Sequence, residues 1–399
     1  MLLSIAFMLL LGMFLGWICK KIRFPGLFGM IITGILLGPH VLNLIDPSIL
    51  QVSSDLRRIA LIIVLLRAGL SLDITDLKKV GRPAVLMCFV PACFEIAGML
   101  LLAPALLGIS RLDAAIMGAV VAAVSPAVVV PKMLMLMDEK YGTKQGIPQL
   151  ILAGASVDDV FVIVLFSTFT GLAQGNAASI RGFVNIPVSI AIGIAVGMLI
   201  GFLLAKFFEK KHMRDTVKVI ILLSLAFLMV TFEDAYADLI PFASLIAVMC
   251  MGIGLQRKRE VVAVRLSAKF NKLWVMAEIL LFVLVGATVD LGSAFTAGAA
   301  AVLLIFGVLL FRMLGVFLCL LGTDLHLKER IFCMFAYMPK ATVQAAIGGL
   351  PLAMGLACGN IVLTVSVLAI LITAPLGAFL IDLTYKKLLQ KDDSRLQQN

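Results

Sequence analysis

Charged residues are scarce in this chain, and no hydrophilic stretch is long enough to form a separate soluble domain. Asp, Glu, Lys and Arg make up 14% of the 399 residues, 62% are hydrophobic, and the mean hydropathy is +1.12. Soluble domains carry about 25% charged residues. Apolar runs of about 20 residues, the length of a membrane-spanning helix, recur from end to end. Because lipid leaves backbone groups no other partners, the composition predicts an all-α polytopic membrane protein.

Histidine is nearly absent, and cysteine forms no metal-binding pattern. The three histidines (His40, His212 and His326) lie at the ends of apolar segments, and none of the seven cysteines belongs to a CxxC pair. Buried cysteines of this kind act as small hydrophobic residues. We therefore expect no divalent-metal site and no cofactor.

The positive charge is distributed as a topology signal and does not indicate a nucleic-acid surface. The net charge is +10, but the basic residues gather in alternate short loops. This asymmetry predicts an odd number of spans, with the N-terminus outside and the C-terminus in the cytoplasm. The first apolar segment is followed, not preceded, by basic residues, so it is expected to be a retained span. Short termini without targeting signals favour a prokaryotic plasma membrane.

About thirteen spans are predicted within one membrane domain, 1–399. Two six-span halves of opposite orientation would flank a linker span, which is the inverted-repeat plan of many secondary transporters. The predicted spans are 2–19, 24–42, 55–72, 83–108, 111–137, 148–173, 187–208, 216–234, 238–256, 270–290, 296–321, 329–350 and 359–385.

Prolines interrupt the fifth and twelfth spans, which correspond to each other in the two halves. The fifth contains Ser125-Pro126 and Pro131, and the twelfth contains Pro339. Proline removes a backbone donor and clashes with the preceding turn, so both helices are predicted to be broken near mid-membrane. Two matching interruptions indicate a binding site between them. Two ordinary proline kinks are the alternative.

Two adjacent carboxylates, Asp158 and Asp159, lie near the middle of span 148–173. A single charge at the bilayer centre costs about 2.5–3.5 kcal/mol. Helical neighbours point about 100° apart, so one carboxylate can face a cavity and the other a neighbouring helix. Burial and like charge both disfavour ionisation of the pair. Such a site can release a proton when a monovalent cation arrives and regain one when it leaves.

Besides Glu278, which lies near the cytoplasmic end of its span, four more charged residues are singled out within predicted spans, and with the two aspartates their signs balance. Glu95 and Arg312 occupy corresponding spans, so we predict a buried ion pair between them. Arg312 could alternatively extend its side chain to the lipid headgroups. Lys340 follows the proline at the break of the twelfth span, where a structural role and a transport role both remain open. Arg67 supports the site or only holds Asp73.

Four stretches between residues 66 and 346 resemble sodium/proton antiporters of the cation:proton antiporter superfamily. The similarity is to the aspartate-pair division and, within it, to the NHA-type branch. The matching stretches are Leu66-Arg67-Ala68-Gly69-Leu70-Ser71-Leu72-Asp73, Val124-Ser125-Pro126-Ala127-Val128-Val129-Val130-Pro131, Ala155-Ser156-Val157-Asp158-Asp159 and Pro339-Lys340-Ala341-Thr342-Val343-Gln344-Ala345-Ala346.

The resemblance implies two crossing broken helices and a core domain that moves against a dimerisation domain. Residues 1–54 and 187–264 would form mainly dimerisation helices, and 55–173 and 296–385 mainly core helices of a homodimer in the lipid membrane. Asp159 would be the main carrier of Na+ or Li+ and of the proton, assisted by Asp158. The residues implied near the ion are Ser125, Pro126, Lys340 and Thr342.

One departure concerns stoichiometry. Several aspartate-pair antiporters have a lysine in span 11 that can carry a proton, whereas this chain has Arg312, as the NHA-type branch does. Arginine is not deprotonated in proteins, so electroneutral exchange is favoured, with Lys340 as the other possible carrier.

Other functions explain the sequence less well. A K+/H+ antiporter or a symporter on the same fold is the main alternative, although a symporter would not need the aspartate pair. An intramembrane aspartyl protease needs two aspartates on different helices and a Gly-x-Gly-Asp motif, which is absent. A channel would show a filter sequence or a ring of charges along a pore. The sequence therefore predicts a cation/proton antiporter.

Overall fold

The computed structural model describes residues 1–22, 24–71, 81–176, 180–236, 240, 242–288 and 291–392. In this part of the chain the regular secondary structure is helical, apart from an isolated antiparallel bridge between Tyr141 and Lys391. Eight helical stretches of the described residues are long and apolar enough to cross a membrane. Each of the thirteen predicted spans coincides with a helix or with two helices separated by a break, so the all-α membrane fold is confirmed.

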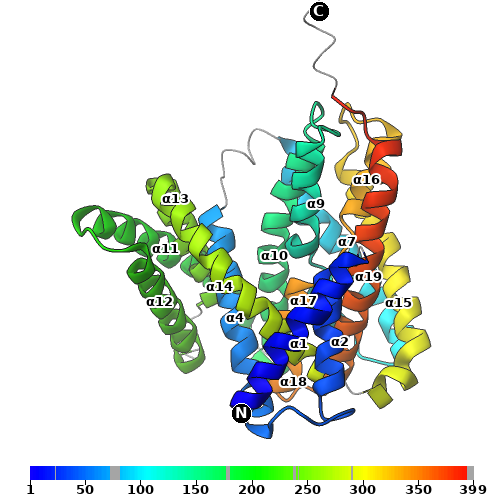
Figure 1. Cartoon of the computed structure of the whole chain (residues 1–399), viewed down its shortest axis with the longest axis horizontal. Coiled ribbons are helices and arrows are strands. Elements are labelled where there is room, and N and C mark those ends of the chain that lie inside the picture. Colours follow the sequence, from blue (N-terminus) through cyan, green and yellow to red (C-terminus); the bar gives the residue numbers. More distant parts are fainter. Residues whose placement is uncertain are drawn as a thin grey trace, which may run out of the picture. The chain divides into compact units, whose positions relative to one another are not determined.

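The chain divides into two compact units, which are described separately. The first comprises Met1–Val52, Thr75–Phe166 and Phe282–Asn399, and the second comprises Ser53–Ile74 and Ser167–Leu281. The helices are α1 (Leu2–Lys21), α2 (Gly26–Leu37), α3 (Pro47–Gln51), α4 (Ser53–Ser71), α6 (Arg82–Met87), α7 (Val90–Leu107), α8 (Arg111–Val121), α9 (Pro126–Asp138), α10 (Ile147–Gly171), the π-helical turn η1 (Leu172–Asn176), α11 (Ile180–Lys210), α12 (Asp215–Tyr236), α13 (Ser244–Lys258), α14 (Glu260–Ala287), α15 (Leu291–Cys319), α16 (Leu327–Ala336), α17 (Thr342–Ile347), α18 (Leu350–Ala353) and α19 (Gly359–Leu388) (Figure 1).

In the second unit, α11 packs closely against α13, and α13 packs against α4. Small residues permit this approach: an added Cβ at Gly197 or Gly201 of α11 would lie within 2.4 Å of a backbone oxygen of α13. Close packing through small residues is typical of helices in membranes, where the hydrophobic effect gives no drive to associate.

In the first unit, α7 lies along α15, and α15, α16 and α19 pack against one another (Figure 1). The predicted breaks of the fifth and twelfth spans are confirmed, since α8 and α9 are separated by residues 122–125, and α16 and α17 by 337–341. Pro126 begins α9, while Pro131 lies inside it without ending it.

The predicted span 83–108 is formed by two helices. A turn at Cys88 and Phe89 separates α6 from α7, whose second residue is Pro91. Proline is tolerated in the first turn of a helix, because the backbone N–H that it lacks would have no helical acceptor there. It nevertheless leaves the carbonyl four residues earlier without the N–H that would pair with it in a continuous helix. Among the described residues of the first unit, the spans 83–108, 111–137 and 329–350 are thus interrupted.

Candidate functional site

The two predicted breaks, in the α8/α9 and α16/α17 spans, lie against each other in the first unit. The Ser125 backbone N–H donates to the Pro339 carbonyl, with 2.8 Å between nitrogen and oxygen. The α8 and α16 helices end at this place, and α9 and α17 begin there. A break exposes backbone groups that a helix would otherwise pair, so other residues must satisfy them.

Four fully buried charged side chains converge beside the breaks. Glu95 comes from α7, Asp158 from α10, Arg312 from α15 and Lys340 from the α16/α17 break, and each is 0% exposed. Two acids and two bases give this cluster no net charge when all four are ionised. Opposite charges and hydrogen bonds are the conditions under which buried ions are tolerated.

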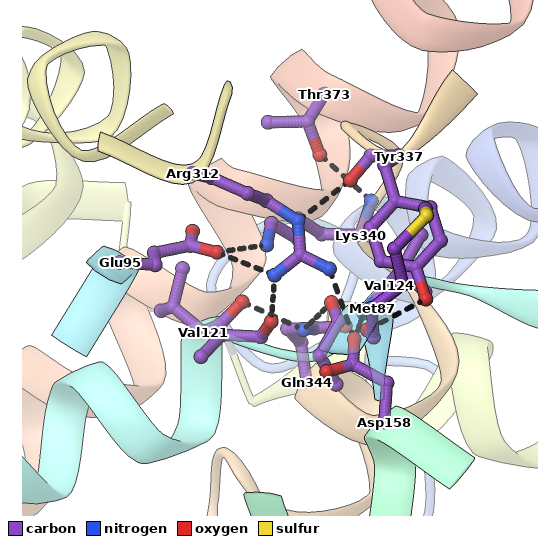
Figure 2. A network of polar contacts seen from close by, with 12 residues as sticks. Met87, Glu95, Val121, Val124, Asp158, Arg312, Tyr337, Lys340, Gln344 and Thr373 are labelled. Atoms are coloured by element: carbon purple, nitrogen blue, oxygen red, sulfur yellow. Dashed lines mark hydrogen bonds and ion pairs between the residues drawn. The ribbon is translucent and has the colours of Figure 1, made fainter. Parts of the chain in front are cut away.

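Arg312 lies between the two acids, as Figure 2 shows. Its Nη1 is 2.8 Å from Glu95 Oε2, so the ion pair predicted between these two residues is present. Its Nη2 is 2.9 Å from Asp158 Oδ2. Lys340 Nζ binds Glu95 Oε2 at 2.5 Å. Arg312 is thus the base that pairs with Asp158, and Lys340 is the second partner of Glu95.

The same guanidinium also caps the carboxyl ends of α16 and α8, the first halves of the two broken spans. Nε donates to the Tyr337 carbonyl at 2.6 Å, just after α16, and Nη1 donates to the Ala122 carbonyl, just after α8. Pro126 has no N–H with which to pair the Ala122 carbonyl, which lies four residues before it. A cation is also favourable at the negative ends of two helix dipoles.

The aspartate pair lies on α10. Asp158 Oδ2 accepts a second hydrogen bond, 2.9 Å long, from the Val124 backbone N–H of the unwound α8/α9 segment. Asp158 Oδ1 is buried and has no hydrogen-bond partner among the described residues. The next residue, Asp159, is half-buried.

The other predicted site residues are distributed as follows. Ser125 precedes Pro126 at the start of α9, and Thr342 begins α17. Both hydroxyl groups are buried without a hydrogen-bond partner in the described part of the chain. Arg67 belongs to α4 of the second unit, where it contacts Asn271 at 3.4 Å and lies 5.2 Å from the Trp274 ring centre. Its suggested partner Asp73 lies outside the described residues.

Three further residues hold the network together and were not singled out from the sequence. Thr373 Oγ1 accepts the Lys340 backbone N–H at 2.9 Å, and the Gln344 amide donates to two carbonyls at the α8/α9 break. The Tyr337 hydroxyl donates to the Met87 carbonyl at 3.1 Å. A polar side chain inside an apolar span is the signal that could have identified them, because such groups are paired when buried.

Comparison with known proteins identifies similar transporters. The family model described as "Sodium/hydrogen exchanger, transmembrane" matches residues 6–387. Sodium/hydrogen exchanger 9B2 of Mus musculus is 36% identical over 397 residues, covering 94% of this chain and 70% of the relative. Sodium/hydrogen exchanger 9B1 of Homo sapiens is 31% identical over 365 residues, covering 86% and 69%.

The fold also has a solved counterpart. The sodium proton antiporter MjNhaP1 from Methanocaldococcus jannaschii matches with a TM-score of 0.83 and 21% sequence identity, over 96% of this chain and 97% of that one. The likeness shows that the chain has the antiporter fold. Because the family match extends over nearly the whole chain and includes both broken spans and all four charges of the network, this chain belongs to the sodium/hydrogen exchanger family, a family of membrane transporters and not of enzymes.

Proposed function

We propose that this protein exchanges Na+ for H+ across its membrane, with cation and proton competing for the Asp158–Asp159 pair. The observation that carries the proposal is the state of Asp158. One of its oxygens is held by Arg312 and the Val124 N–H, and the other is buried without a protein donor among the described residues. A buried carboxylate oxygen of this kind needs a cation or a proton.

Neutral oxygens near the breaks would complete the cation site. Ser125 Oγ and Thr342 Oγ1 are buried acceptors at the starts of the two second half-helices. Hydroxyl and carboxylate oxygens suit hard monovalent cations, and discontinuous helices provide such ligands in many transporters. Na+ and Li+ are both expected substrates.

Charge balance explains why a proton would leave when the cation enters. The Glu95–Arg312–Asp158–Lys340 network is neutral with all four groups ionised. A bound Na+ would add one positive charge to this buried region unless a proton left at the same time, and such a charge is costly. Asp159, next to Asp158 and half-buried, is the proposed proton carrier.

Alternating access would expose this site to one side of the membrane at a time. We propose residues 55–173 and 296–385 as the moving core and residues 1–54 and 187–264 as the scaffold through which a homodimer forms. The lysine and arginine distribution supports an outside N-terminus and a cytoplasmic C-terminus, and a prokaryotic plasma membrane remains the expected location.

Proton movement in liposomes tests the proposal. Purified protein would be reconstituted with an imposed pH gradient and a pH-sensitive dye, and Na+, Li+ and K+ added in turn. We expect Na+ and Li+ to collapse the gradient, Asp159→Asn to abolish the response, and Asp382→Asn, at the far end of α19, to retain it. A response to K+ alone would keep the mechanism and change the substrate, whereas folded protein without any cation response would contradict the proposal.

A further inference from the structure

The unwound segment after α8 has its backbone groups paired by other parts of the chain. The Val121 and Ala123 carbonyls accept from Gln344 Nε2 at 3.0 and 2.9 Å, and the Ala122 carbonyl between them accepts from Arg312. The next two N–H groups, of Val124 and Ser125, donate to Asp158 and to the Pro339 carbonyl. These contacts replace the helical hydrogen bonds that the break removes.

Gln344 is the uncharged side chain in this set, and its orientation is fixed by its donors. It is 1% exposed, and both hydrogens of its amide are directed at the two carbonyls. The reversed amide would place Oε1 against two other oxygens, so the hydrogen bonding admits one orientation. Gln344 therefore ties the third residue of α17 to the end of α8 (Figure 2).

The Ala123 carbonyl and the Val124 N–H belong to the same peptide group. Gln344 holds the oxygen of that group, and Asp158 accepts its hydrogen. Because a peptide group is planar and rigid, rotating the oxygen away from Gln344 also rotates the N–H away from Asp158. One peptide plane thus connects an uncharged residue of α17 to the carboxylate of α10.

We infer that Gln344 is a positioning residue that keeps the Val124 N–H directed at Asp158 and so sets the cation affinity of the site. The inference rests on the proposed function, which it deepens. Without Gln344 the peptide group is free to turn, and Asp158 loses a donor that favours its ionised form. Proton would then compete better against Na+, which raises the apparent KM for Na+ and moves the pH of half-maximal transport towards alkaline values.

Two substitutions and two readouts test this role. Gln344→Met keeps the length of the side chain and removes both donors. Gln344→Glu keeps the shape, and its protonated carboxyl can restore one of the two hydrogen bonds at low pH. Hydrogen–deuterium exchange of peptides containing Val124 and Ser125 reports the unwound segment directly, and liposome transport gives KM and maximal rate for Na+.

In Gln344→Met we expect faster hydrogen–deuterium exchange of the backbone amides in residues 121–125. The apparent KM for Na+ should rise about tenfold, which is the effect of one lost hydrogen bond to a charged group. The maximal rate should change much less than KM. Gln344→Glu should show a smaller defect at low pH than at high pH, which a purely steric role would not produce. Gln149→Met, on half-buried Gln149 near the start of α10, is the matched control and should behave as the wild type.

Unchanged hydrogen–deuterium exchange in residues 121–125, together with an unchanged KM for Na+, in Gln344→Met would overturn the inference. If Gln344→Met does not fold, a pH-independent KM ratio between Gln344→Glu and the wild type would overturn it. Failure of the proposed function gives a different result, because the wild type itself would then show no Na+-driven proton movement. In that case the hydrogen–deuterium exchange measurement alone decides whether Gln344 holds the unwound segment after α8.

Discussion

The hydroxyl of Tyr337 donates a hydrogen bond to the carbonyl of Met87, with 3.1 Å between the two oxygens. Pro91, four residues after Met87, has no N–H to offer this carbonyl, so the tyrosine replaces the missing helical donor. The carbonyl of Tyr337 accepts from Arg312 Nε, and its ring centre lies 5.1 Å from the guanidinium carbon. Tyr337 thus connects the α6/α7 break to the charge network.

Replacing Tyr337 by Phe should destabilise the protein without changing which cation it transports. The substitution leaves the buried Met87 carbonyl without its donor, which costs about 1–3 kcal/mol. The Tyr337 carbonyl and ring, which contact Arg312, remain. A lower Tm in detergent is expected, and Tyr236→Phe, at a tyrosine that is 47% exposed, should leave Tm unchanged. Equal Tm values for the two variants would contradict this prediction.

Gly154 lies one helical turn before Asp158 and makes room for the Tyr337 hydroxyl. A Cβ at position 154 would be 2.4 Å from Tyr337 Oη and 3.0 Å from Met87 Cβ. We therefore expect Gly154→Ala to lower Tm, with part of the loss recovered when Tyr337→Phe removes the clashing oxygen. Neighbouring residues of this kind give non-additive free energies, commonly about 0.5–3 kcal/mol.

The control for that double-mutant cycle is on the same helix. A Cβ at Gly171, the last residue of α10, would meet no heavy atom within 4 Å, so Gly171→Ala should be tolerated. Strictly additive effects of Gly154→Ala and Tyr337→Phe would show that the two positions are not in contact.

Glu95→Gln should be far more damaging than loss of a charge pair near the surface. It leaves Arg312 and Lys340 with Asp158 as the acid of the network, and removing one partner of a buried ion pair costs about 3–5 kcal/mol. Asp382→Asn breaks the Lys132–Asp382 pair, whose side chains are 24% and 33% exposed, and should cost about 1 kcal/mol or less. Similar losses of Tm in the two variants would contradict this comparison.

Exchange should not respond to membrane potential. Arg312 is the base that pairs with Asp158, and a guanidinium keeps its charge. One Na+ would then move against one H+. Initial rates measured in liposomes at a clamped potential of zero and of about 100 mV should agree, because net movement of one charge would change the driving force by about 2.3 kcal/mol.

A rate that does depend on potential would point to Lys340 as a second carrier. Its ammonium is buried and bound to Glu95 at 2.5 Å, so it is in direct contact with the network. In that case Lys340→Met should remove the voltage dependence. Retention of voltage dependence in Lys340→Met would exclude both assignments.

Features that lipid penalises could be predicted from the sequence. Pro126 and Pro339 break helices wherever the rest of the molecule lies, and charges inside apolar spans must find partners, so the breaks and the Glu95–Arg312 pair were foreseeable. Beyond that pair, which charged residue pairs with which could not be predicted. That Arg312 rather than Lys340 holds Asp158, and that Pro91 ends a helix whereas Pro104 does not, depends on distances between helices that are far apart in sequence.

Side chains that donate hydrogen bonds to backbone carbonyls could not be predicted from the sequence either. Gln344 and Tyr337 bind carbonyls that become available because Pro126 and Pro91 interrupt helices elsewhere in the chain. Hydropathy and charge record which side chains are costly in lipid, but not which carbonyl has lost its donor. Only the arrangement of the helices supplies that information.

The dependence of four helices on one guanidinium also limits how this transporter can diverge. Arg312 serves two acids and the ends of two half-helices at once, so no single substitution that removes or reverses the charge at position 95, 158, 312 or 340 leaves the buried charges balanced. Evolution can cross from this charge pattern to another only through coordinated replacements. In a collection of natural descendants these four positions should therefore vary together or remain fixed together, while the lipid-facing residues around them drift independently.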